Sequence, residues 1–167
     1  GLLVLAKTPE AYENLKTQFL ERKTKKTYMA LVHGELKQEQ GIINSPIVRN
    51  PKAWGKFMVG EDLSKTAITE WKTKQVLSAK GEVLSLLEIQ PLTGRTHQIR
   101  VHMKHLGHPI VSDRLYLGRK QLIKDLAWCS RMFLHASRLE FVHPVNGEKV
   151  CFISEMPNDL ERVIEII

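Results

Sequence analysis

Hydrophobic and polar residues near the start of the chain are spaced as in a strand followed by a helix. Residues 1–6 are apolar and form a run of strand length that ends at Lys7. We interpret this run as a strand inside the fold. Thr8-Pro9 favours a helix start, because Thr caps a helix and Pro fits its first turn. Ala11, Leu15 and Phe19 then recur every four residues, which predicts an amphipathic helix.

The next segment, residues 26–33, alternates in the manner of a strand and ends at Gly34. Alternation places Tyr28, Ala30 and Val32 on one face and the three residues between and after them on the other.

The rest of the chain predicts more strands than helices. Residues 41–60 contain Pro46, Pro51 and Trp54 among cations, which indicates an extended loop or irregular hairpin. The remaining predicted elements are an edge or half-exposed strand at 67–77, a central strand at 81–90, a helix at 95–106, a hairpin of strands 133–142 and 149–154, and a closing helix at 157–167. Strands that follow one another in antiparallel-looking pairs indicate an α+β fold.

Composition narrows the class of protein. A chain of 167 residues fits one domain. It has no apolar run near the roughly 20 residues of a membrane span, so we expect no membrane insertion. Two cysteines do not suggest a disulfide scaffold and favour a reducing compartment, for which we predict the cytoplasm. A net charge of +7 favours a polyanion such as nucleic acid as the partner.

The densest polar stretch, residues 91–102, lies at a predicted strand-to-helix junction. Free backbone N–H groups at a helix start bind anions, and a glycine there lets a phosphate approach. A capped helix with a solvated cationic face is the alternative. The candidate binding residues of this stretch are Thr93, Gly94, Arg95, Thr96, His97, Gln98 and His102.

Two further residues are candidates for chemistry. Arg100 lies between Ile99 and Val101, so its helix is partly buried and its guanidinium needs a carboxylate partner; a surface arginine is the alternative. Tyr28 follows Lys25 and Lys26, a combination that can stack a base and hold its phosphate. A core tyrosine explains the same pattern nearly as well.

Other chemistries have weaker support. Four histidines between positions 97 and 108 invite a zinc site, but only His102 and His105 share a helix face, so we expect no metal. Ser137 and His135 lack the nucleophile elbow of a hydrolase.

Three segments together resemble the RluA-type pseudouridine synthase family. They are Lys-Thr-Tyr-Met-Ala-Leu-Val-His-Gly at 26–34, Leu-Thr-Gly-Arg-Thr-His-Gln-Ile-Arg-Val-His at 92–102, and Leu-His-Ala at 134–136 with Leu139, Phe141, His143 and Pro144. His-Pro-Ile-Val-Ser-Asp at 108–113 is similar to a fourth family segment, with Ser112 where glycine is usual.

The resemblance implies a mixed, mostly antiparallel central sheet with flanking helices and an RNA-binding cleft. It also implies that a uridine is flipped out of ribosomal or transfer RNA, its glycosidic bond is cleaved, the base rotates, and C5 is joined to C1′, without cofactor or metal. Flipping a base takes a few kcal/mol, which stacking and charge contacts offset. A non-catalytic RNA-binding protein or RNA chaperone on the same fold is the alternative function.

By motif position, the resemblance makes Tyr28 the tyrosine that packs on the flipped base and Arg100 the partner of the catalytic aspartate. Leu134 is then a candidate for the wall of the base pocket. The family's aspartate falls five residues before Gly1, so we expect residues 1–167 to be a catalytic domain that is incomplete at its N-terminus. We expect a monomer.

Overall fold

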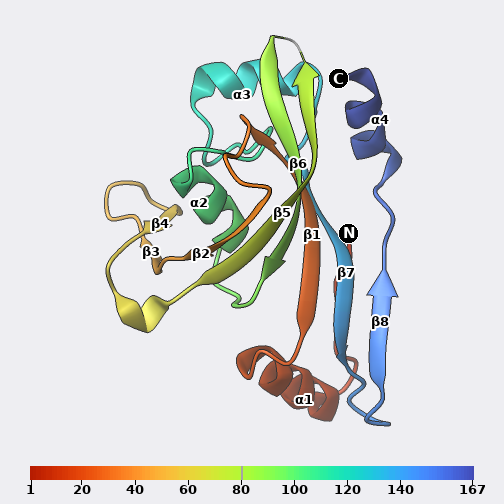
Figure 1. Ribbon diagram of the computed structural model, residues 1–167. Helices are drawn as coiled ribbons and strands as arrows, with labels where there is room; N and C mark the ends of the chain where they lie inside the picture. The colour runs from red at the N-terminus through yellow and green to blue at the C-terminus, as the bar shows by residue number, and fades with distance from the viewer. Residues whose placement is uncertain (80) are drawn as a thin grey trace.

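A computed structural model describes residues 1–79 and 81–167, and its central element is a six-stranded sheet (Figure 1). The strands lie in the order β2-β5-β6-β1-β7-β8, and every neighbouring pair is antiparallel. The predicted α+β class is therefore confirmed. The sheet consists of β1 (Lys25–His33), β2 (Gln40–Asn44), β5 (Ile68–Ala79), β6 (Glu82–Pro91), β7 (Leu134–Val142) and β8 (Lys149–Ile153).

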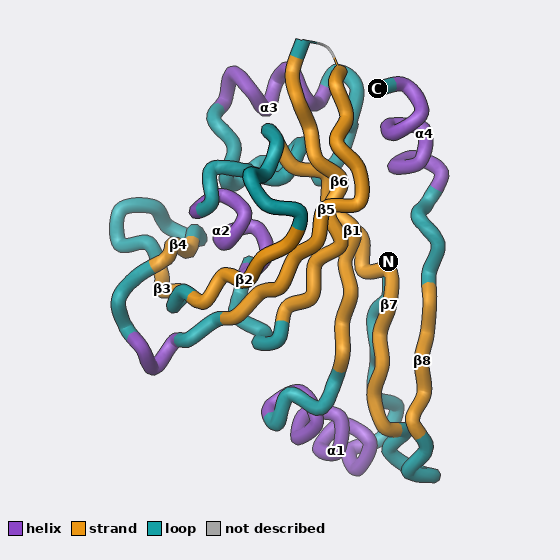
Figure 2. Tube along the Cα trace, viewed as in Figure 1, coloured by secondary structure: helices purple, strands orange, loops and turns teal. Residues whose placement is uncertain are grey.

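A second, two-stranded sheet stands apart from the first (Figure 2). Its strands, β3 (Ile47–Arg49) and β4 (Phe57–Val59), form an irregular hairpin as predicted for residues 41–60. The start of that range differs from the prediction, because it belongs to β2, which pairs with β5 in the six-stranded sheet. The described helices are α1 (Pro9–Leu20), α2 (Gln98–His105), α3 (Arg119–Leu126), α4 (Asn158–Ile166) and the short 3-10 helix η1 (Leu63–Lys65). None of the described helices combines the length and apolarity that crossing a membrane would take.

The two faces of β1 pack against different helices, as its alternation predicts. Ala30 and Val32 lie in a core cluster with Ile99 and Met103 of α2, and Tyr28 packs against its edge. The opposite face carries a second cluster, in which Leu31 and residues of β6 meet Leu160 and Val163 of α4. The cluster on the Tyr28 face fixes α2 against the sheet and so positions the residues that precede it.

The N-terminal run is extended but is not a regular strand, so that prediction is wrong. Its backbone makes one bond to the sheet, from Leu2 N to Ala136 O at 2.9 Å. β7 already pairs with β1 and, from Arg138 onward, with β8, which leaves little of its edge free. The side chains still alternate as in a strand, because every second residue, Leu2, Val4 and Ala6, packs against the cluster around Leu139.

Two other differences concern helices. The helix expected from residue 95 begins at Gln98, because residues 95–97 form a turn and His97 takes a left-handed conformation (φ 55). α3 was not predicted, since its sequence Arg-Lys-Gln-Leu-Ile-Lys-Asp-Leu carries no long apolar stripe. The strand predicted at 67–77 is half exposed but is not at the edge, because β2 covers it.

Candidate active site

One cavity of about 360 Å³ gathers most of the predicted site residues. β1 contributes Lys26 and Tyr28, and α2 contributes Arg100. The turn between β6 and α2 supplies the cavity's remaining polar rim. Its lining is Phe19, Lys26, Tyr28, Pro91, Thr93, Gly94, Arg95, His97, Gln98, Ile99, Arg100 and Leu134.

Gln98 holds the turn in shape with both ends of its buried side chain. Its Oε1 accepts hydrogen bonds from Thr93 Oγ1 at 2.7 Å and Arg95 N at 2.9 Å. Its Nε2 donates to Ile68 O at 2.9 Å and Thr69 Oγ1 at 3.0 Å. Thr93 Oγ1 also accepts from Ile68 N. The predicted RNA contacts of Gln98 and Thr93 are therefore corrected: their polar groups are used within the protein, and they shape the cavity wall.

The exposed part of the turn is open to a ligand. A Cβ at Gly94 would meet no atom within 4 Å, so the fold itself does not require glycine there. Its backbone is thus accessible at the cavity rim. Arg95 is exposed and tethered by Nε to Thr66 O at 3.3 Å and by Nη2 to Ser64 O at 3.2 Å.

Arg100 makes a two-pronged ion pair with Asp113. Nε donates to one carboxylate oxygen at 2.8 Å and Nη2 to the other at 2.7 Å. The carboxylate is almost fully buried and also accepts from the backbone of Leu115 and Tyr116. The prediction that Arg100 needs a carboxylate is confirmed, and within the described chain that carboxylate is Asp113. Nη1 makes no hydrogen bond to the described residues.

His97 joins the turn to a neighbouring aromatic cluster. Its Nδ1 lies 2.9 Å from the Tyr116 hydroxyl, which accepts a hydrogen bond from Phe57 N at 3.0 Å. The rings of Phe57 and Tyr116 both meet His97 edge-on at 5.7 Å. Burial and the nearby Arg100 charge lower the pKa of His97, so its ring is neutral at pH 7.

Burial also changes the two β1 side chains in the cavity. It raises the pKa of Tyr28, so the phenol stays protonated at neutral pH, and it lowers the pKa of Lys26. Lys26 Nζ lies 5.8 Å from the centre of the Phe19 ring, and Leu134 forms an apolar part of the wall. Tyr28 thus offers the cavity an aromatic face and a hydroxyl that bonds to no described residue.

Three predicted binding residues lie outside the cavity. His102 is completely buried, with Nδ1 2.8 Å from Thr69 Oγ1 and Nε2 3.0 Å from Ser45 O. Its predicted RNA contact is therefore wrong, because both ring nitrogens are committed to the core. Lys25 and Thr96 are exposed, and neither lines the cavity.

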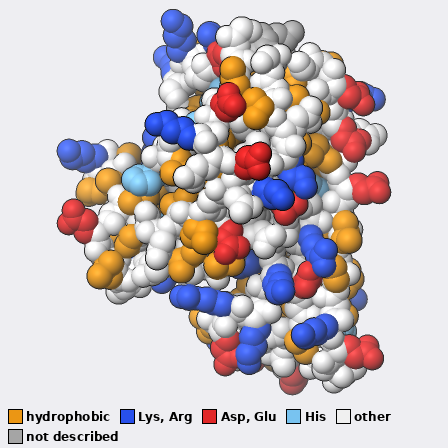
Figure 3. Space-filling view, in the orientation of Figure 1, with side chains coloured by type: hydrophobic (Ala, Val, Ile, Leu, Met, Phe, Trp, Pro, Cys, Tyr) orange, Lys and Arg blue, Asp and Glu red, His pale blue; other side chains and the backbone are white. Residues whose placement is uncertain are grey.

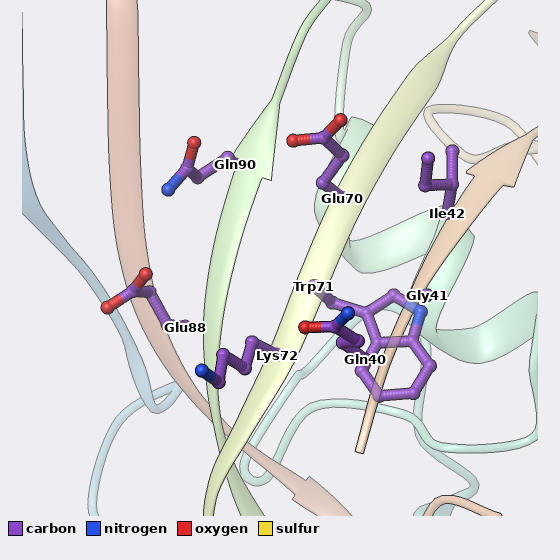
Figure 4. A pocket seen from close by; sticks show the side chains of 8 residues that line it. All are labelled: Gln40, Gly41, Ile42, Glu70, Trp71, Lys72, Glu88 and Gln90. Carbon is purple, nitrogen blue, oxygen red and sulfur yellow. The ribbon is translucent and has the colours of Figure 1, made fainter. Parts of the chain in front are cut away.

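A second cavity, of about 400 Å³, lies along β2, β5 and β6 (Figure 4). Glu70, Lys72 and Glu88 line it, so negative charge faces any ligand there. On the side of the molecule that Figure 3 shows, basic side chains are interspersed with acidic and hydrophobic ones. A polyanion is therefore better matched to the cavity around Tyr28 and Arg100, whose lining contains no Asp or Glu among the described residues.

Comparison with known proteins identifies the family. The family model described as RNA pseudouridylate synthase matches residues 1–105, which is more than half of the chain. The chain belongs to the RNA pseudouridylate synthase family. A relative named dual-specificity RNA pseudouridine synthase RluA, from Yersinia pestis, is 39% identical over 93% of this chain and 72% of its own length. The predicted RluA-type resemblance is thereby confirmed.

Other members of the synthase family are longer than this chain. An uncharacterized RNA pseudouridine synthase of Aquifex aeolicus is 40% identical over 98% of the chain but only 52% of its own length. The chain thus spans about half the length of this curated relative. The solved structure of human RNA pseudouridylate synthase domain containing 1 has a TM-score of 0.78 and 29% identity, covering 95% of this chain and 66% of that one.

Sequence reasoning missed several residues of this synthase-family cavity. Phe19 was placed on the apolar stripe of α1, and its stripe position gave no sign that it also faces the cavity. Ile99 was noted only as the apolar neighbour of Arg100 in the sequence. Asp113 was noted only as the last residue of the segment at 108–113, and the structure buries it behind the cavity wall, against Arg100. The unmet need of Arg100 for a carboxylate was the signal that could have connected the two.

Proposed function

We propose that the cavity around Tyr28 and Arg100 is the uridine site of an RNA pseudouridine synthase. In this reaction the N1–C1′ bond breaks, the uracil rotates, and a C5–C1′ bond forms. The proton on C5 leaves to solvent and N1 gains one, so the product is an isomer and no cofactor is needed. The observation that carries the proposal is that one basic cavity, in a chain of this family, brings together Tyr28 and Arg100 from separate elements.

Tyr28 supplies the surface on which the flipped base stacks. Its ring is half buried, faces the cavity, and keeps a protonated hydroxyl because burial raises its pKa. Stacking on an aromatic side chain contributes about 1–3 kcal/mol per base, which offsets the few kcal/mol needed to unstack a nucleotide. Leu134 borders the same space with an apolar side chain.

Arg100 positions the nucleophile. Asp113 holds the guanidinium through Nε and Nη2, and this leaves Nη1 for a second carboxylate. We propose that this carboxylate is the family aspartate in a segment before Gly1. Leu2 bonds to Ala136 of β7, and Ala136 is the register partner of Tyr28, so a segment preceding Gly1 would enter the fold beside β7, one strand away from Tyr28.

RNA contacts come from the cations around the cavity. Lys26 and Arg95 line it, and Lys25 lies exposed next to Lys26. Thr96 and the accessible backbone at Gly94 lie at the rim, where free N–H groups favour phosphate. Such contacts release counterions, so binding weakens as salt rises.

Isomerisation is tested with RNA that carries tritium at C5 of uridine. The intact protein should release tritium to water from ribosomal or transfer RNA. Tyr28→Leu should reduce that rate at least about 100-fold while RNA binding changes less than about tenfold, because one stacked base contributes only part of the affinity. Binding without tritium release from either RNA would exclude the isomerase and favour the non-catalytic RNA-binding alternative.

The finer properties are proposals of the same kind. We propose that residues 1–167 act as a catalytic domain, on ribosomal or transfer RNA, as a monomer in the cytoplasm. The name of the Yersinia pestis relative, which includes dual specificity, supports testing both RNA classes in parallel. Sedimentation of the intact protein tests the monomer, and a fluorescent fusion in cells tests the compartment.

A further inference from the structure

Trp54 lies at the tip of the β3–β4 hairpin and is 100% exposed. The tip is ordered by its own backbone: Asn50 N donates to Lys56 O at 2.9 Å, and Lys56 N donates to Ala53 O at 3.1 Å. Gly55 takes a positive φ of 74°, which closes the turn next to the tryptophan. A large apolar ring on an ordered tip, packed against nothing, is typical of a surface that meets a partner.

The charges around Trp54 are all positive. Arg49, Lys52 and Lys56 flank it, and none of them forms an ion pair with a described carboxylate. A cavity of about 240 Å³ lies beside the ring, lined also by Arg49 and Phe57. An aromatic ring among unpaired cations matches a nucleic acid base with its phosphate.

The hairpin is continuous with the proposed uridine site. A second cavity, of about 230 Å³, shares Lys56 and Phe57 with the Trp54 cavity and extends to Lys104, His105 and Tyr116. Tyr116 in turn contacts His97 and Arg100, which line the uridine site. In Figure 1 the hairpin projects from the side of the molecule where α2 lies. A strand of RNA lying in the uridine site therefore has a basic path toward Trp54.

We propose that Trp54 stacks on an unpaired base of the RNA that flanks the target uridine, with Lys52 and Lys56 binding the adjoining phosphates. This inference rests on the proposed function in so far as RNA is the substrate. It adds a second base-binding subsite, outside the site of the reaction. Stacking is sequence-tolerant because every base has an aromatic face, so the subsite selects single-stranded over paired flanking RNA.

The test uses the intact protein and an oligoadenylate of about ten nucleotides. This probe contains no uridine, so its binding does not depend on isomerisation. Trp54→Ala should raise the Kd about tenfold, Trp54→Phe should stay within about threefold of wild type, and Lys52→Gln should lower the salt slope by about 0.7. Val145→Ala is the control: Val145 is an apolar residue on the β7–β8 turn that is 85% exposed, and this variant should bind as wild type does.

Fluorescence gives a second readout, because Trp54 is one of three tryptophans and the other two are buried or half buried. Oligoadenylate should quench the wild-type emission and leave Trp54→Phe unquenched. Equal binding by Trp54→Ala and wild type, quenching that persists in Trp54→Phe, or equal losses in Trp54→Ala and Val145→Ala would each overturn the proposal. The first result would also favour a protein as the partner of the hairpin.

Tritium release, measured in parallel, separates this inference from the proposed function. Stacking of oligoadenylate on Trp54 without tritium release supports the subsite and overturns the isomerase. Tritium release with an unchanged Kd in Trp54→Ala supports the isomerase and overturns the subsite.

Discussion

Asp113→Asn tests how much the ion pair with Arg100 stabilises the folded site. The substitution keeps the shape of the side chain, and the amide oxygen can still accept from Leu115 N at 2.9 Å. It removes the negative charge opposite a guanidinium whose side chain is only 15% exposed. Arg100 is then left partly buried without its counter-charge, since no other described carboxylate bonds to it.

The structure sets the size of the effect. Removing one partner of a buried ion pair typically destabilises a protein by about 3–5 kcal/mol. Arg100 retains some solvent through the cavity, and its guanidinium lies 4.9 Å from the Tyr116 ring centre, which compensates in part. We therefore expect a loss of about 3 kcal/mol, at the low end of this range.

A double-mutant cycle in urea measures the pair. Arg100→Met, Asp113→Asn and the double variant are unfolded with urea, and midpoints are compared at constant m-value. The double variant should be less destabilised than the sum of the single ones by about 1–3 kcal/mol, because it contains no unpaired charge. Additivity within about 0.5 kcal/mol, or a loss below about 1 kcal/mol in Asp113→Asn, would refute the reasoning.

Two further predictions concern Lys26 and Asp125. Lys26→Met removes an ammonium group whose pKa is lowered by burial, so the urea midpoint at pH 7 should rise. The salt slope of RNA binding should fall by about 0.7–0.9. An unchanged slope would show that Lys26 does not contact phosphate. Burial alone would raise the pKa of Asp125, but hydrogen bonds from His33, Ser112 N and Gln121 outweigh it and hold the pKa below its usual value. A carboxylate with a lowered pKa stabilises the folded state at pH values above its unfolded-state pKa of about 3.9, and this stability is lost as pH falls through the folded-state pKa. The free energy of unfolding in urea should therefore fall more steeply toward pH 3 in the wild type than in Asp125→Asn. Parallel pH profiles of the two proteins would contradict this.

Periodicity predicted β1, β5, β6 and β7, because each of these strands buries residues on at least one face. It missed β2, which lies in the range predicted as a loop or irregular hairpin. It could have predicted the burial of His102 too, since His102 lies three residues after Ile99 and next to Met103 on the packed face of α2. The polar character of the motif around it masked that signal. The bonds of Gln98 to Ile68 and Thr69 could not be predicted, because they join residues about thirty positions apart whose proximity only the β5–β6 pairing creates.

The sequence identified the main candidate residues of the site but not their arrangement in space. Tyr28 and Arg100 stood out by their neighbours in sequence, whereas their shared cavity depends on α2 packing across β1. The start of α2 was placed too early for a related reason. The left-handed conformation of His97 is stabilised by Tyr116, which comes from a different segment, and no local sequence pattern reports such a contact.

Departures from regular structure lie on both sides of the cavity. The β1–β7 register shifts between Thr27 and Tyr28, and such a bulge re-aims the side chain next to it. Opposite, His97 has a positive φ that costs about 1–3 kcal/mol unless its surroundings hold it, and here Tyr116 and Phe57 do so. Arg100 follows within one turn, held by Asp113. These contacts already fix the cavity in the folded chain. In the proposed function, the free energy of RNA binding is therefore available for unstacking the target base and is not needed to assemble the site.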